Sequence, residues 1–169
     1  YGVNVQYGDS HFEYPVHLNV DNREGFDEAV EAAKAVDQVV LVMGETARMS
    51  GEGRSRADIG LPGLQQELLE AIHAVNPNIV LVVMSGRPLV LTWAHEHVPA
   101  IVQAWHLGHR SGEAITDVLT GKENPSGKLP MSFPRSVGQV PIYYNHLNTG
   151  RPGPRNEVTW AHYLDEQNS

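Results

Sequence analysis

The sequence predicts an α/β fold: a three-layer sandwich in which helices cover both faces of a mostly parallel, doubly wound sheet. Two observations lead to this fold class. Short runs of β-branched and apolar residues alternate along the chain with segments of helical periodicity. Each run is almost continuously hydrophobic, which is typical of strands covered on both sides. With 169 residues, 41% of them hydrophobic, the chain is long enough to build a core as a single domain over 1–169.

The first elements lead into the first core strand. Residues 1–24 are expected to form an initial strand followed by an irregular loop. Apolar residues then recur with helical spacing from Phe26 to Val36, and acidic side chains near the start suit the helix dipole. The run at 37–44 predicts a strand that is buried on both faces.

Further strand and helix units complete a predicted βαβ core over 25–121. They are a helix over 64–75, a strand over 79–84, a short helix over 89–95, a strand over 100–105 and a helix over 112–119. Prolines then accumulate and helical periodicity fades. We therefore expect 122–169 to be an irregular, Pro-rich C-terminal tail that wraps around a neighbouring surface.

Composition excludes several classes of function. The chain has 12 Lys and Arg against 20 Asp and Glu, a net charge of −8, so we expect neither nucleic acid nor a membrane surface as a partner. Its longest apolar run, 79–84, is too short to span a bilayer. The lack of cysteine excludes disulfides and thiolate chemistry. Because the chain begins at Tyr1 without a signal segment, we interpret it as part of a longer multidomain protein.

Three loops follow the carboxyl ends of the predicted strands, where open α/β sheets bind ligands. They cover 44–62, 85–88 and 106–111. The first is the longest and most polar, a combination that is more typical of a functional loop than of a simple connection. It contains two candidate acidic residues.

Glu52 lies between two glycines, which allow a carboxylate to come close to a ligand; the alternative is a solvated turn. Glu45, one residue past the strand, is the rival candidate. Its alternative is a structural carboxylate that caps backbone amides or pairs with Arg48 or Arg56. The residues alone do not decide which of the two glutamates has a functional role.

Cofactor motifs are not matched. The glycines at Gly121 and Gly127 have the wrong spacing for a phosphate loop, and no dinucleotide-binding glycine fingerprint is present. The histidine pairs at 95/97 and 106/109 lack metal-ligand spacing. We therefore expect no cofactor and no metal, and a nucleotide-binding domain is disfavoured.

A series of ordered motifs runs from about residue 39 to residue 165. They are GE at 44–45, SGEGRSR at 50–56, IGLPG at 59–63, SGRP at 85–88, QAW at 103–105, GEAITDVL at 112–119, NPSGKLP at 124–130, GQVPIYYNH at 138–146 and NTGRP at 148–152. Together they resemble the C-terminal α/β-sandwich domain of family 3 glycoside hydrolases, of the bacterial periplasmic β-glucosidase type.

The resemblance implies a retaining O-glycosyl hydrolase that removes terminal non-reducing β-D-glucosyl residues from β-glucosides or oligosaccharides, with Glu52 as general acid/base. It implies that an N-terminal β/α barrel, upstream of Tyr1, supplies an aspartate nucleophile, and that a fibronectin-type domain follows. The chain alone is then expected to be inactive, and the full enzyme to be periplasmic or secreted.

Two alternatives to the β-glucosidase interpretation stay open. The chain is either a non-catalytic structural or carbohydrate-binding module of a glycosidase, or part of a β-xylosidase or N-acetylhexosaminidase relative. The sequence does not separate these, because the resemblance assigns recognition of the sugar mainly to the barrel. It also leaves open whether Glu52 or Glu45 is the acid/base.

Overall fold

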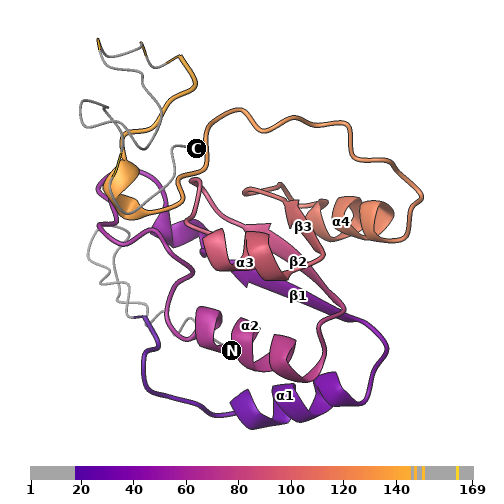
Figure 1. Ribbon diagram of the computed structural model, residues 1–169. Helices are drawn as coiled ribbons and strands as arrows, with labels where there is room; N and C mark the ends of the chain where they lie inside the picture. Colours follow the sequence, from indigo (N-terminus) through magenta and orange to yellow (C-terminus); the bar gives the residue numbers. More distant parts are fainter. Residues whose placement is uncertain (1–17, 146, 148–149, 151–162, 164–169) are drawn as a thin grey trace, which may run out of the picture.

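The computed structural model describes residues 18–145, 147, 150 and 163, and it shows a three-stranded sheet flanked by helices (Figure 1). The elements in chain order are α1 (Phe26–Lys34), β1 (Val39–Gly44), the 3-10 helix η1 (Ala47–Met49), α2 (Gln65–Val75), β2 (Ile79–Met84), α3 (Thr92–His97), β3 (Ala100–Gln103), α4 (Ser111–Leu119) and the 3-10 helix η2 (Val137–Gln139). No helix of this described part is long and apolar enough to cross a bilayer.

The sheet is entirely parallel, with the strand order β1-β2-β3. Its register begins with Val39 opposite Ile79 on the β1 side and Val80 opposite Ala100 on the β3 side. Parallel neighbours need crossover connections, which α2 and α3 provide here. The α/β class and the predicted parallel strands are confirmed, and all three strands present their carboxyl ends at one edge.

The core forms where alternate strand residues face the helices. Leu81 of β2 is fully buried and belongs to one hydrophobic cluster with Leu69 and Ile72 of α2. α1 lies against α2 and adds Phe26 to the same cluster (Figure 1). Burying each large aliphatic side chain contributes about 1.5–3 kcal/mol, so this cluster gives the loops a stable base.

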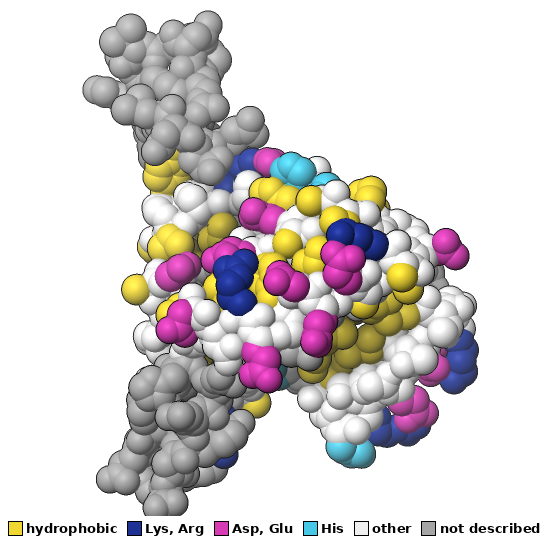
Figure 2. Space-filling model, turned by 90° about the horizontal axis from the view of Figure 1, so that it is seen from below, with side chains coloured by type: hydrophobic (Ala, Val, Ile, Leu, Met, Phe, Trp, Pro, Cys, Tyr) yellow, Lys and Arg dark blue, Asp and Glu magenta, His cyan; other side chains and the backbone are white. Residues whose placement is uncertain are grey.

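The other side of β1 differs from the prediction. Val40 and Val42 are 46% and 60% exposed, so the expectation that this strand is buried on both faces is wrong for the described chain. Among the described strands β1 lies at the edge of the sheet, and its alternate residues Val39, Leu41 and Met43 face the helix layer. Figure 2 shows a hollow with a hydrophobic floor, between the main body and a projecting part that carries Lys, Asp, Glu and His side chains.

Two element boundaries also shift for physical reasons. α3 begins at Thr92 and not at residue 89, because the backbone N–H of Val90 donates a hydrogen bond to Ile59 O (2.9 Å) and Leu89 is fully buried in the core. β3 ends at Gln103 and not at Trp105, because Trp105 adopts a positive φ of 55° that interrupts the strand.

The predicted initial strand and most of the predicted tail beyond residue 145 lie outside the described residues. Part of the earlier tail contacts the core. Thr92 Oγ1 donates a hydrogen bond to Arg135 O (2.6 Å), and the Phe133 ring lies 5.8 Å from the Trp105 ring between centroids. The division of the chain into a core and a wrapping tail stays a prediction.

Candidate functional site

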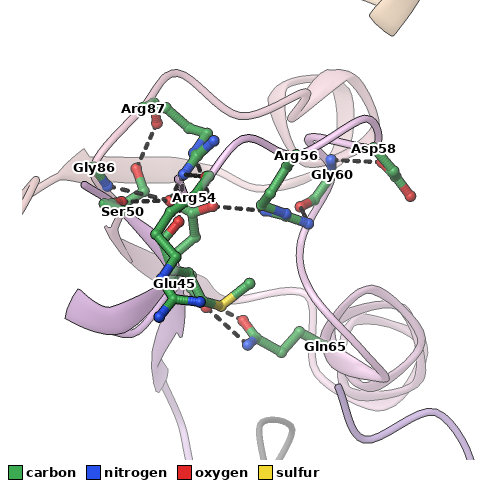
Figure 3. Close-up of polar contacts among 12 residues, drawn as sticks. Glu45, Ser50, Arg54, Arg56, Asp58, Gly60, Gln65, Gly86 and Arg87 are labelled. Atoms are coloured by element: carbon green, nitrogen blue, oxygen red, sulfur yellow. Dashed lines mark hydrogen bonds and ion pairs between the residues drawn. The ribbon is translucent and has the colours of Figure 1, made fainter. Parts of the chain in front are cut away.

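The three loops that follow the strands meet at one edge of the sheet, as expected, and Figure 3 shows polar contacts between the loops after β1 and β2. Gly86 N–H, after β2, donates to Glu45 Oε2, after β1 (3.3 Å). Arg87 Nη2 donates to Arg54 O in the long loop (2.9 Å). The loop after β3 lies close to the loop after β2: the His106 ring is so near Gly86 that a Cβ added to Gly86 would lie 3.1 Å from His106 Cδ2.

Glu45 is the buried charge at the centre of this site, with a side chain that is 0% exposed. Its Oε1 pairs with Arg56 Nη1 (2.8 Å) and Arg87 Nε (3.1 Å). Its Oε2 accepts longer contacts from Ser50 Oγ (3.4 Å) and Gly86 N (3.3 Å). A buried carboxylate costs several kcal/mol unless it is paired and hydrogen-bonded, and here it has two guanidinium partners.

The pairing with Arg56 that the sequence suggests for Glu45 is present, while the choice between Glu45 and Glu52 as the acid/base stays a prediction. The carboxylate pairs with Arg56, as one of the two suggested arginines, and it also caps a backbone amide. Its second cation, Arg87, was missed by sequence reasoning because the two residues are 42 positions apart. The only sequence signal was the SGRP motif at 85–88, at the end of the next predicted strand.

The end of β1 is fixed by a side chain of α2. The Gln65 amide, which is buried, makes both backbone-like hydrogen bonds to Gly44: Gly44 N–H donates to Oε1 (2.6 Å), and Nε2 donates to Gly44 O (2.9 Å). Gly44 has a φ of 124°, and a Cβ there would lie 2.0 Å from Met84 O, so only glycine fits. This clamp sets the direction in which the chain enters Glu45.

Arg87 also holds the backbone on both sides of Glu52. Its Nη2 donates to Met49 O and to Arg54 O (2.9 Å), the carbonyls that precede and follow residues 50–53. The turn between them is closed by Arg54 N–H donating to Gly51 O (3.2 Å). Arg87 therefore ties the base of the turn to the sheet edge.

Glu52 lies at the exposed tip of this turn. Its flanking residues, Gly51 and Gly53, have φ values of 114° and 68°, which other residues adopt with strain. Within residues 18–145 the Glu52 side chain makes no hydrogen bond or ion pair. An exposed carboxylate of this kind is able to exchange a proton with a bound ligand, and its acid/base role stays a prediction.

Two histidines of the described chain, His73 and His97, take part in ring packing with Trp93. The His97 ring stacks on the Trp93 ring at 4.4 Å between centroids, and its Nδ1 is hydrogen-bonded to Trp93 O (2.8 Å). No group of three or more His, Asp or Glu side chains in the described residues is arranged to hold a metal ion.

In the third loop, the hydrogen bond from Arg110 to Glu113 raises the pKa of the Arg110 guanidinium.

Comparison with known proteins shows which family the sequence resembles. Residues 3–165 match the sequence family described as the glycosyl hydrolase family 3 C-terminal domain. A periplasmic β-glucosidase of Salmonella typhimurium is 52% identical over 145 residues, 84% of this chain and 19% of that protein. A β-xylosidase of Formosa agariphila is 49% identical over 123 residues, 73% of this chain and 17% of that protein.

A solved structure shares the fold as well. A mutant β-glucosidase of Listeria innocua in complex with laminaribiose is 37% identical, with a TM-score of 0.81 over 91% of this chain and 22% of that one. The chain thus spans about a fifth of the length of the relatives that it matches. With the family profile covering nearly all of its residues, the chain belongs to glycoside hydrolase family 3 and corresponds to the C-terminal domain of that family.

Proposed function

We propose that this chain is the acid/base-bearing domain of a retaining β-glucosidase. The observation that supports this most directly is a contrast between the two glutamates of one loop. The Glu45 carboxylate is buried and forms two ion pairs, whereas Glu52 is exposed on a turn that Arg87 anchors at its base. Of the two candidates, Glu52 is therefore the carboxylate that is able to reach a substrate.

Retaining hydrolysis needs two carboxyl groups about 5–5.5 Å apart, on either side of the glycosidic bond. In the proposed reaction Glu52, protonated, donates its proton to the leaving oxygen while an aspartate attacks the anomeric carbon. Glu52 then takes a proton from the water that releases the sugar. We place the aspartate in the N-terminal barrel of the full-length protein, which we take to be about as long as the relatives and to include a fibronectin-type domain.

Terminal non-reducing β-D-glucosyl residues are the proposed substrates, and the periplasm or the cell exterior the proposed location. The names of the Salmonella and Listeria relatives, with the laminaribiose complex, support the substrate, and the Salmonella name supports the location. The Formosa relative favours a second candidate, β-xylosidase activity. Comparing kcat/KM of the full-length protein for aryl β-glucosides and aryl β-xylosides separates the two.

The acid/base role is tested in the full-length protein with Glu52→Ala and the control Glu28→Ala, which removes an exposed glutamate of α1. Phenyl β-glucoside, a poor leaving group, needs the proton, and dinitrophenyl β-glucoside does not. For Glu52→Ala we expect kcat/KM on the phenyl substrate to fall about 10²- to 10⁴-fold. On the dinitrophenyl substrate kcat/KM should stay within about threefold, with azide raising kcat and yielding glucosyl azide.

An equal loss on both substrates, or no loss on either, would contradict the acid/base role of Glu52 and favour a non-catalytic module. A matching test uses the 169-residue chain alone. Because we assign the nucleophile to the barrel, we expect the isolated chain to release no dinitrophenol above the buffer rate. Release of dinitrophenol above that rate by the purified chain would overturn that assignment.

A further inference from the structure

We propose that Arg87 is a positioning residue for Glu52, held in its own orientation by Glu45. This inference rests on the proposed acid/base function of Glu52 and names the contacts on which that function depends. Arg87 donates hydrogen bonds to Glu45 and to carbonyls on both sides of the Glu52 turn. It therefore joins the buried charge to the reactive carboxylate.

The contacts use different atoms of one planar group. Nε faces the Glu45 carboxylate at 3.1 Å and 3.2 Å from its two oxygens, while Nη2 donates to Met49 O and Arg54 O. Because the guanidinium is rigid, fixing Nε also fixes the direction of Nη2. A lysine ammonium is a single point charge on a flexible stem, so it does not reproduce this fork.

The backbone of the Glu52 turn has little else to restrain it. Gly51 and Gly53 lie on either side of Glu52, and glycine loses more backbone freedom on folding than any other residue. Both positions have open space around them, with no atom within 4 Å of an added Cβ, so packing does not restrict them. The contacts at the base of the turn are then the main restraint on where the carboxylate lies, and a 1 Å displacement of a reacting group can cost about 100-fold in rate.

A second contact holds the start of the same turn. A Cβ on Gly86 would lie 2.1 Å from Ser50 Oγ and 2.6 Å from Ser50 Cβ. The backbone next to Arg87 thus packs directly on Ser50, which in turn approaches Glu45 through its hydroxyl. A side chain at position 86 would push the turn away without changing any charge.

The test uses the full-length protein with Arg87→Met and the matched control Arg23→Met, which removes an exposed arginine that is also paired with a glutamate. For Arg87→Met we expect kcat/KM on phenyl β-glucoside to fall about 10- to 100-fold, with the value on dinitrophenyl β-glucoside within about threefold. Arg23→Met should leave both values within about twofold.

A double variant tests whether Arg87 acts through Glu52. Since Glu52→Ala removes the group that Arg87 positions, adding Arg87→Met to it should cause no further loss on the phenyl substrate beyond about twofold. A merely structural role would instead multiply the two losses and would lower kcat/KM on both substrates. Either of those results would overturn the proposal.

Arg87→Lys and Gly86→Ala provide the same test if Arg87→Met fails to fold. Both should show the selective loss on the phenyl substrate, the first because the fork is missing and the second because Ser50 is displaced. Full activity in both would overturn the proposal. If Glu52→Ala itself shows no dependence on the leaving group, the proposed function fails; if it does and the Arg87 and Gly86 variants do not, only the positioning role fails.

Discussion

Glu45 and Glu52 belong to the same loop, yet their surroundings are opposite. The Glu45 side chain is fully buried and touches two guanidinium groups, whereas Glu52 is exposed on a turn between two positive-φ glycines. The pairing at Glu45 ties the loop to the ends of two strands. In this loop the buried, neutralised carboxylate at the base holds the backbone in place, because the exposed tip has too few contacts of its own to do so.

The largest effect should come from removing the buried carboxylate. Glu45→Ala leaves Arg56 and Arg87 facing each other without their shared anion, and breaking a buried pair in this way costs about 3–5 kcal/mol. We expect urea unfolding, followed by tryptophan fluorescence, to show this loss. The control Glu67→Ala removes an exposed pair with Arg23 and should cost less than about 1 kcal/mol. Equal effects of the two variants would show that the Glu45 network does not stabilise the loop.

The next effect compares glycines in the two regions. Gly44→Ala places a Cβ 2.0 Å from Met84 O at a φ of 124°, so the backbone of two strands must separate; we expect a loss of about 3 kcal/mol. Gly53→Ala meets no atom within 4 Å and adds only the strain of a φ of 68°, about 1–2 kcal/mol. Thermal unfolding of the two variants measures the difference. A larger loss for Gly53→Ala would mean that the turn, and not the strand end, is the more tightly packed region.

A smaller effect is expected at the clamp on β1. Gln65→Ala removes both hydrogen bonds to Gly44 and leaves a buried N–H and C=O without these partners, at a cost of about 2 kcal/mol. Gln66→Ala is the neighbouring control, since the Gln66 amide donates a hydrogen bond to the exposed Glu70 carboxylate. Urea midpoints that shift equally would contradict the clamp.

The hydrophobic pattern of the sequence was enough to predict the central strand of the sheet. The strand at 79–84 is a continuous apolar run that is buried in the sheet, and its length and position were predicted correctly. The exposure of Val40 and Val42 was not predictable, because it depends on which elements lie over β1 and not on the residues of β1 itself. Hydrophobic runs report that a strand suits burial, not that something covers it.

The candidate site divides in the same way. Glu52 and its glycines are adjacent in sequence, so the exposed turn was visible as a motif. The partners of Glu45 are not adjacent: Arg87 comes from the end of another strand, and Gln65 reaches Gly44 from a helix 21 residues away. Such contacts exist only once the parallel register has brought the carboxyl ends of the strands together. Sequence reasoning therefore found the residue proposed to react and missed the residue proposed to position it.

The smallest effect on stability should come from the tip itself. Glu52→Gln keeps the size of the side chain and removes only an exposed charge, so the free energy of unfolding should stay within about 0.5 kcal/mol. Glu45→Gln, the same change at the base, should cost several times more, because two partly buried guanidinium groups lose their counter-charge. Urea unfolding of the pair isolates the effect of surroundings from that of chemistry. If both changes cost the same, the loop is not divided into a stabilising base and a free tip.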